Sequence, residues 1–143
     1  MTDDSDAARA YCLDDQVGFL MRRANQRHLA IFAYDIPDLT PTQFAALAKL
    51  HELGNTTQNA LGRATAMDAA TIKGVVDRLR KRGLVRGSPD PSDQRRTCLE
   101  LTAAGRALFA ELAPRALDVT RHTLEPLSPE ERKQFLALLA RLT

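Results

Sequence analysis

Positively charged side chains are concentrated in the middle of the sequence, where their number suits the binding of a polyanion. Residues 54–106 contain ten lysines and arginines against five acidic residues, so this segment carries +5. Because the whole chain of 143 residues is only +2, the remainder carries −3. A basic centre between acidic ends is the distribution that phosphate binding requires, although a solvated basic face would show a similar excess. The positions of the cations in the fold must decide between a phosphate-binding surface and a solvated basic face.

Two short helices are predicted to position these cations. Thr57 can cap a helix over residues 58–65, and Asp68 can cap a second helix over about residues 69–82. Gly83 ends the second helix as a left-handed C-cap. The second helix has an apolar stripe that is predicted to pack on the first helix: Ile72, Val75, Val76 and Leu79.

The face opposite this stripe is predicted to enter a DNA groove. Small and hydrogen-bonding side chains near the start of the helix can approach base edges, while Lys73 and Arg78 can reach guanine or phosphate. Together with the two capping residues and two later arginines, the candidate DNA-binding residues are Thr57, Asp68, Ala70, Thr71, Lys73, Gly74, Arg78, Arg95 and Arg96.

Two β-type runs follow this helix, at residues 84–86 and 97–101. The segment between them, GSPDPSDQRR, is rich in turn-forming residues and predicts a mobile hairpin tip. Its Arg95 and Arg96 would lie over the minor groove, where the negative potential attracts arginine. This order of elements is that of a winged helix-turn-helix, so the predicted fold is mainly α with a small β-hairpin wing.

The segment before this lobe predicts a tail and two helices. Residues 1–12 are expected to form a loose tail. Apolar residues at steps of three and four predict an amphipathic helix from Asp14 to about residue 34. Thr40 as N-cap and Pro41 at the first helical position begin another helix, which ends at Gly54.

The segment after the lobe predicts two further helices. Thr102 caps the first, in which Pro114 should cause a bend or a break. The residues SPEE at 128–131 form a capping box for the second. We expect one compact domain divided into a tail, N-terminal helices for dimerisation and effector binding, a DNA-binding lobe and C-terminal dimerisation helices, at residues 1–12, 13–53, 54–106 and 107–143.

Composition argues against several other classes of protein. With 44% hydrophobic residues and no long apolar run, the chain suits neither a disordered nor a membrane-spanning protein. The acidic, polar start lacks a signal pattern, so we expect the cytoplasm. Cys12 and Cys98 are too few for a disulfide framework and too far apart for a metal clamp. Since no catalytic set, histidine ligand spacing or phosphate loop is visible, we expect no enzyme, metal or cofactor.

The wing DPSDQRRTCLELTAAG, residues 90–105, resembles the Asp-Pro-x-Asp-Arg-Arg…Leu-Thr-x-x-Gly signature of the MarR family of bacterial transcription regulators. The preceding VVDRLRKRGLVRG is similar to the exit of that family's recognition helix, and the resemblance covers about residues 13–142. Gln94 departs from the pattern, since many members carry arginine there. The resemblance implies that Asp93 and Arg95 brace the wing, and that Arg95 or Arg96 serves the minor groove.

The same resemblance implies a homodimer joined through the terminal helices, and a pseudopalindromic operator. It also implies a small organic effector, often an aromatic or phenolic anion, in a cleft between the dimerisation helices and the DNA-binding lobe. An aromatic acid or its CoA thioester is one such effector. The candidate effector-binding residues are Phe19, Arg22, Arg23, Gln26, His28 and Phe44.

Each of these residues also has a plainer interpretation. His28 can be a hydrogen-bonded core histidine, and Phe44 can belong to the core. Arg22 and Arg23 can be solvated, or paired with acids across the dimer.

Two other functions remain open from the sequence. One is a thiol-based redox sensor. In the hydroperoxide-sensing branch of the family that the chain resembles, the reactive cysteine lies in the first helix, and Gly18 stands at that place here. Cys12 precedes two acids, which disfavour a thiolate. A winged-helix module that binds only proteins would not need basic residues on its second helix and wing tip.

Overall fold

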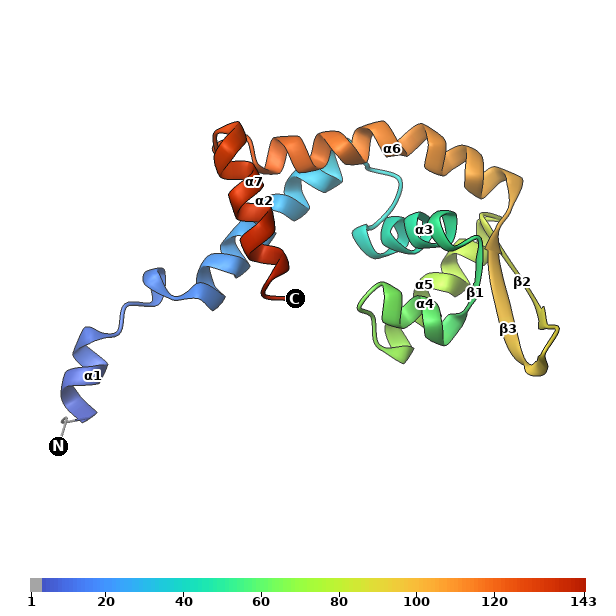
Figure 1. Cartoon of the computed structure of the whole chain (residues 1–143), viewed down its shortest axis with the longest axis horizontal. Coiled ribbons are helices and arrows are strands. Elements are labelled where there is room, and N and C mark those ends of the chain that lie inside the picture. The colour runs from blue at the N-terminus through green and yellow to red at the C-terminus, as the bar shows by residue number, and fades with distance from the viewer. Residues whose placement is uncertain (1–3) are drawn as a thin grey trace.

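The computed structural model describes residues 4–143. It shows a lobe, residues 41–101, and an arm, residues 17–35 and 129–140, joined by one long helix, residues 103–123 (Figure 1). Seven α-helices and a small three-stranded antiparallel sheet make up this part of the chain, which confirms the predicted fold class. The elements are α1 (Asp4–Ala10), α2 (Val17–Asp35), α3 (Pro41–Leu53), β1 (Asn55–Thr57), α4 (Gln58–Ala64), α5 (Ala69–Lys81), β2 (Val85–Asp90), β3 (Asp93–Leu101), α6 (Ala103–Thr123) and α7 (Pro129–Ala140).

The N-terminal segment corrects two expectations. Helix α1 stands where a loose tail was expected, although it buries none of its residues; residues 1–3 of that tail lie outside the described part. The run Leu13–Asp15 forms a turn of 3-10 helix, and the extended backbone of Gln16 separates it from α2. The long helix α2 therefore begins at Val17, three residues after the predicted start at Asp14, and the acidic residues Asp14 and Asp15 belong to the preceding 3-10 turn.

Side-chain caps start the helices of the lobe at the predicted positions. Thr40 and Gln43 form a reciprocal capping box at the start of α3, with backbone-to-side-chain distances of 3.1 and 3.2 Å. Asp68 accepts a hydrogen bond of 2.7 Å from the Thr71 N–H at the start of α5, and Thr57 caps α4 in the same way. These local hydrogen bonds satisfy N–H groups that a helix cannot satisfy internally.

The wing is longer and more regular than the sequence suggested. Strands β2 and β3 include most of the segment that was expected to be a loop, and only Pro91 and Ser92 lie between them. Asp90 Oδ1 accepts hydrogen bonds from the N–H and hydroxyl of Ser92, at 2.9 and 2.8 Å, and these hold the turn. The pKa of Asp90 is lowered by the same two bonds.

The hairpin contains an irregularity beside its tip. Pro89 pairs with Thr97 and the next residue, Asp90, pairs with Asp93, so residues 94–96 have no partner on β2. Such a bulge releases side chains from the strict alternation of a strand. Arg95 and Arg96 are both in this bulge.

A third strand was not predicted from the sequence. The three residues of β1 pair with β3 on the side away from β2, from Asn55 opposite Glu100 to Thr57 opposite Cys98. This pairing fixes the start of α4 against the base of the wing, because Thr57 is both the last residue of β1 and the N-cap of α4.

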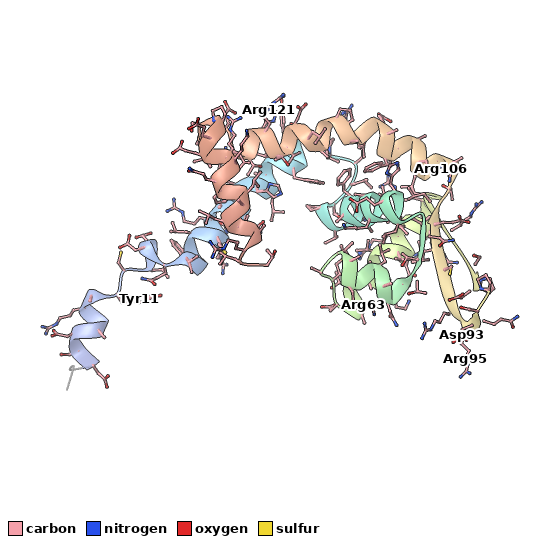
Figure 2. All side chains as sticks on the ribbon, in the orientation of Figure 1. Tyr11, Arg63, Asp93, Arg95, Arg106 and Arg121 are labelled. Carbon is pink, nitrogen blue, oxygen red and sulfur yellow. The ribbon has the colours of Figure 1, made fainter. Side chains whose placement is uncertain are left out.

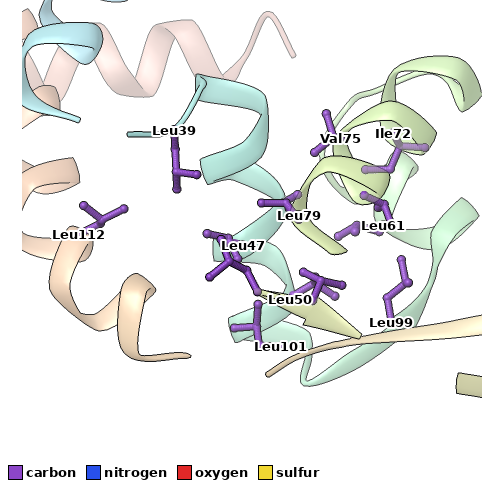
Figure 3. Close-up of a cluster of buried hydrophobic side chains, with 14 of the residues drawn as sticks. Leu39, Leu47, Leu50, Leu61, Ile72, Val75, Leu79, Leu99, Leu101 and Leu112 are labelled. Carbon is purple, nitrogen blue, oxygen red and sulfur yellow. The ribbon is translucent and has the colours of Figure 1, made fainter. Parts of the chain in front are cut away.

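The core of the lobe lies between α3, α4, α5 and the sheet (Figure 3). The apolar stripe predicted on α5 is confirmed, since its four residues are all buried. They meet buried leucines from each neighbouring element: Leu47, Leu50, Leu61 and Leu99. The stripe thereby fixes which face of α5 remains in solvent.

The long helix α6 passes through Pro114 without a break, so of the two outcomes predicted there the split is excluded, and the bend stays a prediction. Pro114 is exposed, and water can satisfy the carbonyl that its missing N–H leaves unpaired. The helix runs from the wing over α3 to the arm, where it lies beside α2 and leads into α7 (Figure 1). The capping box at the start of α7 is confirmed at Ser128 and Glu131.

The start of α6 is pressed against the end of α5. Thr102 caps α6 through the Gly105 N–H at 3.1 Å, while its hydroxyl donates to the Gly83 carbonyl at 2.6 Å. The Thr102 N–H donates to the Leu84 carbonyl at 3.1 Å. A Cβ atom at Gly105 would collide with the Leu84 carbonyl oxygen, so only glycine permits this approach.

We expect Gly105→Ala to lower the free energy of unfolding by about 1–3 kcal/mol, because the added methyl must push α6 away from the base of the wing. Urea denaturation followed by circular dichroism measures this effect. Gly18→Ala is the control, since nothing lies within 4 Å of its added methyl. Equal stability of the two variants would contradict the tight junction.

Candidate DNA-binding surface and effector pockets

The exposed face of α5 carries most of the predicted base-reading residues. Ala70, Thr71, Lys73 and Arg78 are exposed, and Gly74 is half-buried beneath the Arg78 side chain, whose Nη1 lies 3.6 Å from the position of an added Cβ. The face is therefore open to a groove, with small residues towards its N-terminal end. Whether each of these residues contacts DNA stays a prediction.

Asp68 holds the N-terminus of α5. Its hydrogen bonds with Thr71, the backbone N–H first, lower the pKa of the Asp68 carboxyl, so the residue remains charged at neutral pH. A carboxylate engaged in this way positions the helix start, and its charge would repel a nearby phosphate. Thr57 acts similarly for α4, where its hydroxyl is used as a cap.

Lys73 has an acidic partner on the same face. Its Nζ lies 2.9 Å from Asp77 Oδ2, one helical turn later, and both side chains are at least half exposed. The hydrogen bond from Lys73 lowers the pKa of Asp77, with smaller contributions from Arg80 and Lys81. Lys73 is among the predicted DNA-binding residues, but its partner Asp77 is not. In the free protein, Asp77 offsets the charge of Lys73.

The wing tip presents two arginines around one acid. Asp93 accepts a hydrogen bond from the Arg95 N–H at 3.0 Å, and its two oxygens lie 3.8 Å from the Nε atoms of Arg95 and Arg96. The Arg95 side chain is 96% exposed and extends from the tip (Figure 2). These contacts are weak, so both guanidinium groups remain available to a partner.

A polar cavity of about 330 Å³ lies between α4 and the wing. It contains Arg63, which lies in the predicted helix 58–65 but was not among the candidate DNA-binding residues. The pairing of β1 with β3 brings α4 against the wing strand, and this non-local contact could not be seen in the sequence. The lining residues are Thr57, Gln58, Asn59, Arg63, Arg95, Arg96 and Thr97.

The six predicted effector residues do not form one site within the chain. Arg22 and Gln26 are exposed on α2, and the Arg23 guanidinium lies 5.9 Å from the ring centre of Phe19. Phe44 on α3 instead packs between the rings of Phe32 on α2 and Phe109 on α6, at 6.1 and 5.9 Å. The plainer interpretation of Phe44 as a core residue therefore describes its observed surroundings.

His28 lies apart from the other five, in a pocket between α2, α6 and α7. Its Nδ1 is 2.9 Å from the Thr123 hydroxyl. The pocket has a volume of about 360 Å³ and mostly apolar walls, with Asn25, His28, Thr120 and Thr123 as its polar members. Apolar walls with a few convergent polar groups are typical of small-molecule sites. The sequence pattern found His28 but none of the α6 residues.

Arg27 ties the two arm helices together and was not predicted to matter. Its guanidinium donates to the carbonyls of Thr123 and His122, at 2.6 and 3.0 Å. About two turns further along α2, Asp35 Oδ2 lies 2.9 Å from His122 Nδ1. The end of α6 is thus fastened to α2 through Arg27 and Asp35, which line the same pocket as His122.

The arm carries an exposed apolar groove between α2 and α7. None of the residues of α7 is buried, and the groove has a volume of about 500 Å³. Its walls are Val17, Leu20, Met21, Ala24, Phe135, Leu138, Leu139, Arg141 and Leu142. An apolar surface of this extent marks an interaction site in most proteins.

The two cysteines and the other titratable residues form no further site. Cys12 is an exposed free thiol before the 3-10 turn, and Cys98 is a half-buried free thiol on β3. Within residues 4–143, no three histidine, cysteine or acidic side chains are grouped as metal ligands. No helix of the same residues is long and apolar enough to cross a bilayer.

Comparison with known proteins identifies the family. The model of the MarR family matches residues 39–97, which contain α3, α4, α5 and most of the wing. The repressor NicR of Pseudomonas putida is 42% identical over 134 residues, which is 92% of this chain and 85% of NicR. The chain belongs to the MarR family. It is therefore similar over 92% of its length to a transcriptional repressor.

Solved structures of MarR-type regulators agree with this membership. A probable transcriptional regulator from Pseudomonas aeruginosa is 54% identical, with a TM-score of 0.91 over 92% of this chain and 100% of that one. BpsR of Bordetella bronchiseptica is 42% identical, with a TM-score of 0.89 over 92% of this chain and 96% of its own. The BpsR structure concerns regulation of its DNA binding by 6-hydroxynicotinic acid.

For this MarR-family chain, we expect Asp77→Asn to raise DNA affinity roughly threefold to tenfold, because Lys73 then keeps its charge for phosphate. Fluorescence anisotropy with a short duplex measures this gain. The lowered pKa of Asp77 means that the carboxylate stays ionised at every pH above its ordinary pKa. The wild type should therefore show no gain from this residue between pH 8 and pH 5.

The matched control is the double variant Lys73→Ala/Asp77→Asn, in which the cation has been removed as well. It should bind DNA no more tightly than the wild type. A gain of equal size in the double variant would contradict a role for Lys73.

Proposed function

We propose that the protein is a homodimeric, sequence-specific repressor that leaves its operator when a small aromatic acid binds. The observation that carries this proposal is the combination of an open recognition face on α5 with a basic wing, on a fold shared with DNA-binding regulators. Two-fold symmetry would present two α5 helices to successive major grooves of a pseudopalindrome, with half-sites roughly 10 base pairs apart. Such a regulator acts on the chromosome, so we place it in the cytoplasm.

The apolar groove of the arm supports the dimer. Its leucines and Phe135 have no cover in the single chain, and Leu138 is 58% exposed. A second copy related by a two-fold axis offers the same apolar surface in return, so both can be buried together. The arm lies away from the wing, and a contact there would leave both recognition helices free (Figure 1).

A monocyclic aromatic acid suits the His28 pocket by size and chemistry. A volume of about 360 Å³ is near the lower end of the range for small-molecule sites. The ring would lie on the apolar walls, and His28 and Asn25 would hydrogen-bond its polar substituents. BpsR, which responds to 6-hydroxynicotinic acid, suggests a hydroxylated ring with a carboxylate. A CoA thioester would have to extend beyond this pocket.

The effector residues on the outer side of α2 cannot join this pocket in one chain. Arg22 and His28 are six residues apart, which places them about 120° apart around the helix. A second protein surface must face the other candidate residues on α2 if they bind the effector: Phe19, Arg22, Arg23 and Gln26.

The first test is binding of the purified protein to the DNA upstream of its own gene, titrated with salt and then with 6-hydroxynicotinate, hydroxybenzoates and their thioesters. We expect binding at one pseudopalindrome that weakens steeply with salt and is lost with one compound. Release requires that the compound bind the two conformational states unequally.

Each other outcome of this titration has a definite meaning. Binding that no compound changes would contradict the effector but not the repressor. No specific binding at any salt concentration would contradict the regulator and favour a module that binds proteins.

The dimer is tested with Leu138→Glu, which places a charge in the apolar groove. We expect the wild type to sediment at twice the 15.8 kDa chain mass and the variant to dissociate at micromolar concentration. Leu53→Glu is the control, because Leu53 is similarly exposed but lies at the end of α3 in the lobe. Dissociation of both variants, or of neither, would contradict an interface at this groove.

A further inference from the structure

The polar cavity between α4 and the wing has the composition of an anion site. Three arginines line it, together with the hydroxyls of Thr57 and Thr97 and the side-chain amides of Gln58 and Asn59. No acidic residue is among the lining residues. Guanidinium groups with neutral donors are the groups that proteins use to hold phosphate.

Arg63 has no visible role in holding the lobe together. It lies in the last turn of α4, its side chain is exposed, and it forms no ion pair within residues 4–143. Its neighbours on the same helix, Leu61 and Gly62, are buried and provide the packing. The charge of Arg63 is therefore available to a ligand.

Arg96 reaches the cavity because of the bulge in the wing. In a regular ladder Arg95 and Arg96 would point to opposite faces of the hairpin. Residues 94–96 have no partners on β2, so both arginines line the same cavity. Two acids lie near Arg96: Asp93, whose Oδ2 is 3.8 Å from its Nε, and Asp90, whose pKa the Arg96 charge helps to lower.

We propose that this cavity seats one backbone phosphate of bound DNA, clamped between Arg63 of α4 and Arg96 of the wing. The assignment rests on the proposed function, since it needs DNA on this face. Arg63 and the wing tip lie along the same edge of the lobe, opposite the start of α6 at Arg106 (Figure 2). A phosphodiester that enters between α4 and the wing meets cations from both sides.

Such a clamp has a different task from base reading. A phosphate contact carries no sequence information, but it fixes where the protein sits on the duplex. Because the clamp would bind α4 and the wing to the same phosphate, it would determine how deeply α5 enters the major groove. Arg95, which extends beyond the cavity at the tip, remains available to the minor groove.

The test compares Arg63→Ala, Arg96→Ala and the double variant on two duplexes. One duplex is the upstream operator and the other has the same bases in scrambled order. We expect each single variant to lose roughly tenfold in affinity near 0.1 M salt, by the same factor on both duplexes. The slope of log K against log salt should fall by about 0.9 for each contact, or about 1.8 per dimer.

The coupling between Arg63 and Arg96 shows whether they bind one phosphate together or two phosphates separately. If both hold the same phosphate, the double variant should lose much less than the product of the single losses. Arg63→Lys should recover part of the affinity, since it restores the charge without the planar fork. Arg121→Ala is the matched control, because Arg121 is an exposed arginine that pairs with Asp118 at the far end of α6 (Figure 2).

Three results would overturn the proposal. The first is a loss of affinity by Arg63→Ala on the operator alone, which would mean that Arg63 reads bases. The second is a double variant whose loss of affinity equals the product of the single losses, which would mean two separate contacts. The third is wild-type affinity in both single variants. If inorganic phosphate stabilises the wild type against heat but not Arg63→Ala, while DNA binding is unchanged, the cavity is a free-anion site instead. Failure of the wild type to bind either duplex would instead contradict the proposed function.

Discussion

The structure depends on how closely the backbone of α6 approaches the end of the recognition segment. Gly105 lies against the Leu84 carbonyl, and Thr102 bonds to the backbone on both sides of that residue. These contacts join three elements at one point: the C-terminal end of α5, the first strand of the wing and the start of α6. Because the Leu-Thr-x-x-Gly motif supplies both residues, its glycine has a steric reason and its threonine a hydrogen-bonding one. Any rotation of α6 at this point must move α5 and the wing together.

Arginine side chains bonded to main-chain carbonyls help to hold the other end of α6. Arg27 binds the last carbonyls of the helix from α2, and Arg132 binds the carbonyls of Leu124 and Leu127 from α7. Positive charge at a helix C-terminus is favourable, and it also satisfies acceptors that the helix leaves unpaired. The His28 pocket lies within this fastening and shares Thr123 with it. A molecule that displaced the His28–Thr123 hydrogen bond would act on α6 directly, and α6 leads without a break to the recognition segment.

Local signals in the sequence predicted the local structure well. The caps at Thr40, Asp68 and Ser128 and the buried stripe of α5 follow from side chains within four residues of one another, and they were predicted correctly. Strand β1 and the long wing ladder were missed because they depend on pairing between residues about forty positions apart, or on a turn of only two residues. Of the bend or break predicted at Pro114, the break does not occur, because an exposed proline costs a helix one hydrogen bond and not its continuity.

The candidate site shows the same division between local and non-local information. The charge of residues 54–106 indicated the partner correctly at the level of the family, but it could not show which cations are free to bind. Four of the ten already donate to the protein itself, namely Lys73, Arg82, Arg86 and Arg106. Arg63 became a candidate only when β1 placed α4 beside the wing, and Arg96 only through a bulge that no spacing rule predicts. Net charge therefore sets the long-range attraction to DNA, whereas the contact surface is decided by which cations the fold leaves without internal partners.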